Sequence, residues 1–238
     1  MLPILYRDDH LVAVHKPAGL LVHRTQLDRH ETRFAVQLLR DQIGRRVWAT
    51  HRLDKGTSGV LLFALDPETA GLIGRQFEAG TVEKTYVAVV RGHPPETGLI
   101  DHPLSRPADD YESAAADRPS QPAVTRFRRL ACFELPCRVD RYLTSRYAYL
   151  ELHPETGRRH QLRRHLKHIA HPIIGDATYG KGRHNRLFAE LFGQPRLLLA
   201  CTRLVWRHPV DGRLVDVKTP VSGDFAATLA QLGWKDAQ

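Results

Sequence analysis

The sequence has few cysteines, no long apolar segment and a shortage of acidic residues. Its cysteines are an odd number without the spacing of a metal site, which argues against a disulfide scaffold and favours free thiols in a reducing compartment. They are Cys132, Cys137 and Cys201. The N-terminal stretch MLPILYRDDHLVAVHKP contains no continuous apolar run, which argues against a signal peptide and a membrane span. We therefore expect a cytoplasmic protein.

The charge balance points to a polyanionic partner. The 238 residues include 35 Lys and Arg against 26 Asp and Glu, giving a net charge of +9. Such an excess favours binding to phosphate groups with release of counterions, so nucleic acid is the first candidate and an acidic membrane surface the second. With 42% hydrophobic residues the chain can build a substantial core, and we expect one domain over residues 1–238 that acts as a monomer.

Short apolar runs alternate with helical patterns along most of the chain. Periodic apolar positions that begin at N-cap signals predict helices, and continuous or β-branched runs predict strands. The predicted helices span residues 32–43, 66–77, 159–170 and 224–232. The predicted strands span residues 4–6, 11–15, 47–50, 60–65, 82–91, 123–133, 147–152, 197–206 and 214–218. Because several strands can form hairpins, we expect an α+β fold with a mixed, mostly antiparallel central sheet flanked by helices and loops.

Residues 93–122 differ from the rest of the chain, because they are rich in proline, alanine, aspartate and serine. The part that reads PADDYESAAADRPSQP has too little apolar content to pack against a core. We expect the segment to be a mobile surface insertion, and we place no domain boundary there.

The stretch HRLDKGTSGVLLFAL, from His51 to Leu65, places the carboxylate of Asp54 between basic residues and a small-residue loop. Positive charge from Arg52 and Lys55 favours the charged form of this carboxyl group. The loop residues let backbone approach a bulky ligand closely. These are Gly56, Thr57, Ser58 and Gly59. The pattern is typical of an active-site loop, and a solvated turn with an ordinary ion pair is the alternative.

A second cluster, TGRRHQLRRHLKHIAHPIIGDATYG at residues 156–180, is the most basic part of the chain. In a helix Leu162, Leu166 and Ile169 share one apolar face, and the basic side chains fall on the other half. That half carries His160, Arg163, Arg164, Lys167 and His168. One face can pack while the other meets RNA phosphate or an active site, and a solvated cationic surface is the alternative.

Three motifs together resemble the RluA-type pseudouridine synthases, a family that isomerises uridine in RNA. They are HRLD with TSG around Asp54, EKTY at residues 83–86 and GRRHQLR at residues 157–163. The resemblance covers nearly the whole chain, from KPAG after the opening strands to HPIIGD. One departure is Ala200, where members of the family usually have histidine.

Within the family, the sequence LVHRTQLDRHE at residues 21–31 is similar to a bacterial subfamily that lacks an N-terminal RNA-binding appendage. The target of that subfamily is a uridine at tRNA position 65. Sister enzymes that carry the same three motifs modify ribosomal RNA, so this substrate stays open as an alternative. A basic protein that only grips RNA phosphate is a further alternative, which turnover would exclude.

The resemblance also implies a reaction and a set of site residues. Pseudouridine forms when the bond from the uracil nitrogen to the sugar is cleaved, the base rotates and it is reattached through carbon 5, which needs neither metal nor cofactor. Asp54 is then the essential carboxylate, acting on sugar or base, with Tyr86 and Arg163 beside it. Arg52 can fill the stack when the nucleotide is flipped out. We expect RNA contacts from His51, Arg52, Lys55, Thr57, Arg158, His160, Gln161, Arg164 and Lys167.

Two other patterns argue weakly for different chemistry. GDATYGKG at residues 175–182 is close to a phosphate-binding loop, but Gly182 replaces the hydroxyl residue that would hold magnesium, and we expect no helix to follow directly. Four histidines lie close in sequence without an acidic or cysteine ligand at a zinc spacing. They are His160, His165, His168 and His171. We therefore expect neither an NTPase nor a metal site.

Overall fold

The structure, a computed structural model, describes residues 1–24, 31–105, 119–193 and 196–234. Within these ranges the helices are α1 (Ala35–Ile43), α2 (Pro67–Glu78), α3 (Gln161–His168), α4 (Gly182–Phe192) and α5 (Gly223–Gln231). The strands are β1 (Ile4–Arg7), β2 (Leu11–Lys16), β3 (Trp48–Ala49), β4 (Ser58–Ala64), β5 (Glu83–Arg91), β6 (Thr97–Asp101), β7 (Leu104–Ser105), β8 (Ser120–Gln121), β9 (Val124–Leu135), β10 (Ser145–Pro154), β11 (Leu199–Arg207) and β12 (Leu214–Lys218).

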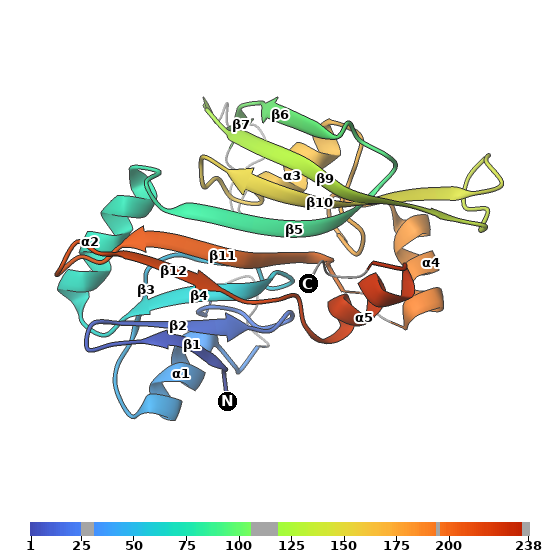
Figure 1. The fold of residues 1–238 in the computed structure, drawn as a ribbon. Coiled ribbons are helices and arrows are strands. Elements are labelled where there is room, and N and C mark those ends of the chain that lie inside the picture. The colour runs from blue at the N-terminus through green and yellow to red at the C-terminus, as the bar shows by residue number, and fades with distance from the viewer. Residues whose placement is uncertain (25–30, 106–118, 194–195, 235–238) are drawn as a thin grey trace.

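One large sheet runs through the molecule in the order β1-β2-β4-β11-β5-β10-β9-β6, as Figure 1 shows. Strand β3 pairs with β4, β12 pairs with β11, and β7 and β8 form a separate two-stranded sheet. Among the described strand pairs, β4 with β11 is the parallel one and the others are antiparallel. The predicted α+β fold with a mixed, mostly antiparallel central sheet is therefore confirmed.

Helices cover both faces of this sheet (Figure 1). Leu162 and Leu166 of α3 pack on one face against side chains of β5, β10 and β11. Phe188 of α4 and Phe225 of α5 pack on the opposite face of the same strands. A third cluster places α1 and α2 against β2 and β4 near the N-terminal end. Because each face of the central strands is covered, apolar residues occupy both faces and the strands read as nearly continuous apolar runs.

Gly59 allows the parallel pair that joins the two halves of the sheet. It lies opposite Cys201 in the register of β4 with β11, and its φ of 112° is in the region that favours glycine. A Cβ atom at this position would lie 1.9 Å from the backbone oxygen of Cys201. The close approach brings the loop that carries Asp54, which ends where β4 begins, next to strand β5 on the other side of β11.

The helix boundaries differ from the predicted ones in places. Asp66 caps α2 as predicted, because its side chain accepts a hydrogen bond from the Thr69 N–H at 2.7 Å. The helix predicted over residues 159–170 is shorter, because His160 adopts a left-handed conformation with φ of 56° just before α3. Helix α4, which begins at Gly182, contradicts the expectation that no helix follows the GDATYGKG segment.

Residues 93–122 were expected to form a mobile surface insertion, but the described residues at both ends of this segment form strands. Strand β6 pairs with β9 as the edge of the main sheet, and Ile100 within it is buried. Strands β7 and β8 pair with each other close to where the described residues stop and resume. The rest of the PADDYES stretch, residues 106–118, lies outside the described residues.

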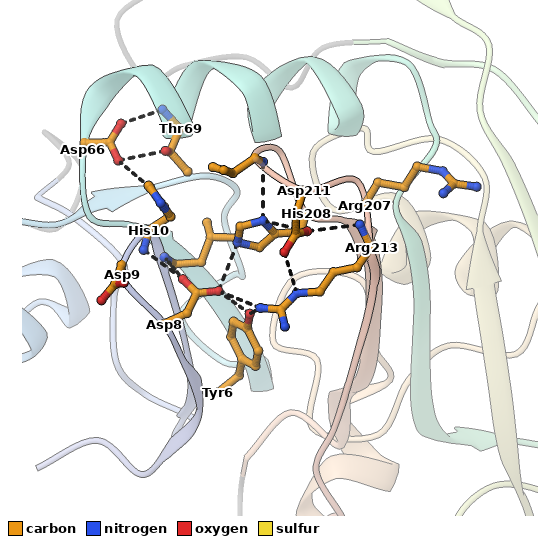
Figure 2. Close-up of polar contacts among 12 residues, drawn as sticks. Tyr6, Asp8, Asp9, His10, Asp66, Thr69, Arg207, His208, Asp211 and Arg213 are labelled. Atoms are coloured by element: carbon orange, nitrogen blue, oxygen red, sulfur yellow. Dashed lines mark hydrogen bonds and ion pairs between the residues drawn. The ribbon is translucent and has the colours of Figure 1, made fainter.

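A polar cluster ties together two turns at the end of the sheet near α2 (Figure 2). Asp8, in the β1–β2 turn, accepts hydrogen bonds from the backbone N–H groups of His10 and Leu11 at 2.8 and 2.7 Å and from the Tyr6 hydroxyl. Its other contacts are with His208 at 3.0 Å and Arg213 at 3.4 Å, both in the β11–β12 turn. We call the following five residues the Asp8 cluster: Tyr6 of β1, Asp8 of the β1–β2 turn, and His208, Asp211 and Arg213 of the β11–β12 turn. It joins hairpins that are about two hundred residues apart in sequence.

In the part of the chain that the structure describes, we find no helix with the length and apolar character needed to cross a membrane.

Candidate active site

Asp54 lies in a tight turn immediately before β4. The Thr57 N–H donates a hydrogen bond to the Asp54 backbone oxygen at 3.0 Å, which closes the turn. The fully buried Lys16 stabilises this turn. Its Nζ donates hydrogen bonds to the backbone oxygens of Lys55, Pro17 and Leu20 at 3.2, 3.0 and 2.7 Å. Burial lowers the pKa of Lys16 to about 7, while attraction by Asp54 acts in the opposite direction. The turn is therefore held by backbone and side-chain bonds on its inner side.

Arg163 of α3 joins two carboxylates. Its Nη1 lies 3.2 Å from Asp54 Oδ2, and its Nε and Nη2 donate to the two oxygens of Asp176 at 2.7 and 2.8 Å. Burial disfavours the charge on Arg163, but the hydrogen bonds that it donates to Asp176 and the attraction by both carboxylates raise its pKa overall. The bidentate pair with Asp176 fixes the plane of the guanidinium, so that Nη1 is the nitrogen that faces Asp54.

Asp176 is itself held in place by backbone. Its side chain has no exposed surface, and its Oδ1 accepts hydrogen bonds from the N–H groups of Thr178 and Tyr179, both at 2.9 Å. Burial raises the pKa of Asp176, but the Arg163 and backbone hydrogen bonds outweigh it and leave the pKa below its usual range. This side chain orients Arg163 and does not line the pocket that contains Tyr86.

His160 and Tyr179 flank the same arginine. His160 Nε2 is 3.8 Å from Asp54 Oδ1, and its Nδ1 is 3.1 Å from the Tyr179 hydroxyl. The Arg163 guanidinium lies 5.0 Å from the centre of the Tyr179 ring. Burial lowers the pKa of His160 although Asp54 attracts its charged form. A neutral imidazole therefore faces the second oxygen of Asp54.

Tyr86 of β5 lines a pocket with Asp54, which we call the Tyr86 pocket. Its other walls come from the Asp54 turn, the end of β10, the following loop, α3 and β11. They include Arg52, Leu53, Lys84, Pro154, Arg158, Leu162 and Leu199. Burial raises the pKa of the Tyr86 phenol well above its usual range, with further contributions from Cys201 and Asp54. The pocket thus offers an apolar and aromatic surface with one carboxylate and one protonated phenol.

The residues predicted as catalytic come together in this pocket. Asp54 and Arg163 are paired and Tyr86 lines the same space, although they come from a loop, a helix and a strand that are far apart in sequence. Arg52 is exposed and lies at the rim of this pocket. Lys55 is half-buried and lies on the other side of Asp54. Lys55 also pairs with Glu31 at 2.8 Å.

Two predicted RNA contacts are scaffold residues. The Nε2 of His51 accepts a hydrogen bond from the Leu62 N–H at 3.1 Å, and its ring stacks on Phe77 with 4.6 Å between ring centres. Burial lowers the pKa of His51 to about 3. Gln161 is buried and bonds Thr156, Arg158, Val124 and Thr125, so the polar atoms of its amide are occupied within the protein. Both side chains bond within the protein, and their predicted contacts with RNA stay predictions.

The remaining predicted contacts vary in exposure. Arg158 is exposed at the Tyr86 pocket, where its Nε donates to the Pro122 backbone oxygen at 3.0 Å, and Thr57 is buried in the Asp54 turn. Arg164 Nη1 donates to the backbone oxygen of Ser105 at 2.7 Å. Lys167 is exposed and lies 5.7 Å from the Tyr179 ring centre. Of these, Arg158 and Lys167 present charge outward.

The histidines of the basic cluster have separate environments. His165 is buried and contacts the Thr125 hydroxyl and the His102 backbone oxygen, both at 3.0 Å. His168 stacks on His102, and His171 contacts the backbone oxygen of Arg91. In the described ranges, no three His, Cys, Asp or Glu side chains are grouped in a way that could hold a metal ion.

The segment that resembles a phosphate-binding loop is filled by protein. A helix does follow it, but the carboxylate of Asp176 already accepts the N–H groups of Thr178 and Tyr179. A nucleotide phosphate needs such N–H groups for itself. The loop instead orients Asp176 toward Arg163.

Sequence reasoning missed Asp176, Lys16 and Lys84. Lys84, in the EKTY motif, lines the Tyr86 pocket, and burial lowers its pKa. Asp176 and Lys16 stand in HPIIGD and KPAG, so membership in a family motif was the available signal. The departure at Ala200 does not face the site, because Ala200 packs toward α4 and α5 while its neighbour Leu199 lines the Tyr86 pocket.

Comparisons with known proteins agree with this geometry. The family model for RNA pseudouridylate synthase matches residues 10–168. The chain is 46% identical over 239 residues to tRNA pseudouridine synthase C of Vibrio cholerae, covering 100% of this chain and 98% of the relative. It is 47% identical over 236 residues to tRNA pseudouridine synthase C of Yersinia pestis, covering 98% of this chain and 92% of the relative.

A solved structure shows the same fold. Human RNA Pseudouridylate Synthase Domain Containing 1 superposes with a TM-score of 0.71 at 29% identity, covering 93% of this chain and 84% of that one. Family match, near full-length identity and fold point the same way. The chain belongs to the RNA pseudouridylate synthase family.

Proposed function

We propose that this enzyme isomerises a uridine of tRNA to pseudouridine, with position 65 as its target. The observation that carries the reaction is the pairing of Asp54 with Arg163 at 3.2 Å beside the Tyr86 pocket. Support for a tRNA substrate comes from the two relatives named above. Both are tRNA pseudouridine synthases, and the similarity extends over nearly their whole length. We expect a monomer that works in the cytoplasm.

Asp54 is the group that acts on the nucleotide. One of its oxygens is paired with Arg163, and the other has His160 at 3.8 Å, which is beyond hydrogen-bond distance. A carboxylate held in this way can attack the sugar or the base, or can stabilise positive charge that develops on the ribose. Arg163 fixes its direction, and Asp176 fixes Arg163.

Tyr86 contacts the uracil or ribose from β5. Because its phenol keeps its proton, the ring face and the O–H group are the features that it offers to the substrate. If the hydroxyl takes part in proton transfer, Tyr86→Phe lowers kcat by about a hundredfold or more. If only the ring stacks on uracil, the same variant keeps kcat, and Tyr86→Ala raises KM instead.

The basic rim holds RNA around the pocket. Arg52, Arg158 and Lys167 are exposed and can meet phosphate groups through their charge, and Lys55 and Arg164 lie half-buried nearby. A uridine inside a paired stem must leave the stack to reach Asp54, and Arg52 is placed to occupy the gap. Arg52→Ala is then expected to impair activity on folded tRNA more than on a short unpaired RNA.

The first test is tritium release from RNA that carries uridine labelled at carbon 5. The protein is expected to release tritium from unmodified tRNA, and tRNA in which position 65 is cytidine is expected to release none. Release from ribosomal RNA alone would move the substrate to that class. If no RNA gives release but binding persists, the enzyme reading is wrong and RNA binding is all that is left.

A further inference from the structure

A second hollow lies on the other side of Asp54, and Arg196 contributes to its wall. We propose that this hollow, the Arg196 pocket, binds a phosphodiester group of the RNA backbone next to the target nucleotide, an inference that rests on the proposed function. Its lining includes Ala18, Gly19, Lys55, Gly56, Arg159 and Arg196, together with the carboxylate of Asp176, whose charge is paired with Arg163. Asp54, His160 and Arg163 line both this pocket and the Tyr86 pocket, so they form the wall between the two.

The order of chemical groups across this wall matches that of a nucleotide. A nucleotide has its base at one end, its ribose in the middle and its phosphate at the other end. The Tyr86 pocket offers aromatic and aliphatic surface from Tyr86, Leu162 and Leu199, which suits a base. With the ribose at Asp54, the adjoining phosphate falls on the side where Lys55 and Arg196 line the hollow. Arg159 lines both pockets, and Lys84 and Arg158 add positive charge to the Tyr86 pocket.

Arg196 is held rigidly by neutral partners. Its Nη2 donates to the Ser58 hydroxyl at 2.9 Å, its Nε donates to the Leu197 backbone oxygen at 3.2 Å, and its guanidinium lies 5.7 Å from the Phe225 ring centre. Across the described ranges, no carboxylate lies within ion-pair distance of it. Burial lowers its pKa, and Asp224 attracts it only from farther away. Its positive charge is therefore available to an anion, and its fork geometry suits phosphate oxygens.

The backbone around Arg196 fixes its place in the pocket. Gly175, with φ of 79°, lies so close that a Cβ atom there would come within 1.8 Å of the Arg196 backbone oxygen. This contact locks the start of β11 against the loop that carries Asp176. On the facing side, Ala18, Gly19 and Gly56 have small or absent side chains, which lets a phosphate group approach closely.

Two variants, one just before β11 and one at its far end, test the proposal. Arg196→Gln removes the charge in the pocket, and Arg207→Gln removes an exposed charge at the far end of β11, where Arg207 Nη1 contacts only the Gly212 backbone oxygen at 3.4 Å. For each, kcat, KM and the salt dependence of RNA binding are measured with unmodified tRNA. We expect Arg196→Gln to raise KM about tenfold or more and to reduce the slope of log K against log salt by roughly 0.7–1, since one phosphate contact is lost.

Arg207→Gln serves as the matched control and is expected to leave KM unchanged. Arg196→Lys keeps the charge without the fork, so it should keep the salt slope and lose part of the affinity. If Arg196→Gln matches Arg207→Gln in KM and slope while the native protein forms pseudouridine, the Arg196 pocket is not a phosphate site and the proposed function stands. If the native protein forms no pseudouridine on any RNA, the proposed function itself fails.

A neutral substrate tests the site without altering its fold. RNA with a single methylphosphonate at a linkage flanking the target uridine lacks one phosphate charge. At the linkage that occupies the Arg196 pocket, this RNA is expected to weaken binding to the native protein by the same factor as Arg196→Gln, with no further loss when the two changes are combined. Independent, additive losses at both flanking linkages would overturn the proposal, even if Arg196→Gln proved unstable.

Discussion

Asp54 and Asp8 have partners of the same kinds, since each meets an arginine and a histidine and lies near a tyrosine. The oxygens of Asp8 are surrounded by two backbone N–H groups, a hydroxyl, an imidazole ring and a guanidinium group, all within the protein (Figure 2). Asp54 has one ion pair at 3.2 Å and a second contact at 3.8 Å, and it faces two pockets. A carboxylate whose acceptor sites are all occupied stabilises the fold, whereas one with an unsatisfied oxygen beside a cavity can act on a substrate.

The largest expected difference between the two is in turnover. Asp54→Asn removes the carboxylate charge and nucleophilicity, and we expect a loss in kcat of about a thousandfold or more. Tritium release under single-turnover conditions measures it, with thermal unfolding as a check on the fold. Residual activity near that of the native protein would remove Asp54 from its proposed role.

The second test concerns how Asp54 is oriented. Asp176→Asn leaves Arg163 without its bidentate partner, and a displaced guanidinium is expected to lower kcat by about a hundredfold. The matched control is Asp216→Asn, because Asp216 also takes a bidentate arginine, Arg203, at 2.8 and 2.9 Å but lies at the surface of β12. Equal kinetics for the two variants would mean that Asp176 has no positioning role.

Substitution in the Asp8 cluster should lower stability and leave activity nearly unchanged, the opposite of what is expected at Asp54. Asp8→Asn removes the carboxylate charge that faces the buried His208 and the exposed Arg213 and weakens the hydrogen bonds that Asp8 accepts. We expect the free energy of unfolding to fall by about 2–3 kcal/mol with kcat and KM little changed. Although burial raises the pKa of Asp8, hydrogen bonds from Tyr6 and the backbone lower it overall. Its contribution is therefore present above about pH 4 and is lost as the pH falls further. Urea unfolding at pH 7 and pH 3 should show the difference from the native protein shrinking.

The smallest expected effect is on the pH dependence of stability, and it concerns His51, which lies close to Asp54 in sequence. The folded pKa of His51 is about 3, below the usual value of about 6.5, so its stabilising effect is complete above pH 6.5 and falls as the pH drops toward 3. In His51→Gln this position cannot titrate. Between pH 7 and pH 5 we therefore expect its free energy of unfolding to fall by about 1–2 kcal/mol less than that of the native protein. Urea unfolding at both values measures this. Parallel curves would place His51 in solvent.

The elements of the fold were largely accessible from the sequence because their signals are local. The N-cap at Asp66, the Asp211-Gly212 turn and the apolar run of β4 each depend on a few neighbouring residues. Helix α4 escaped prediction because it begins at a glycine and carries no side-chain N-cap hydrogen bond that would mark its start. The edge strand β6 escaped because its pairing with β9 is a long-range contact.

For the site, the motifs identified Asp54, Tyr86 and Arg163, while the roles of their neighbours depended on side-chain direction. His51 and Gln161 stand inside those motifs but turn into the protein. Arg196 stands outside every motif and carries no local signal, because only the junction of β4 with β11 places it near Asp54.

The sequence alone determined the class of fold, the basic charge and the identity of the carboxylate, since these depend on composition, local pattern and motif. Only the tertiary structure decided which polar groups satisfy one another and which face a cavity. That distinction arises when segments distant in the chain pack together, because burial and hydrogen-bond partners are properties of neighbours in space. It is what separates Asp54 from Asp8 and places Arg196 across from Tyr86.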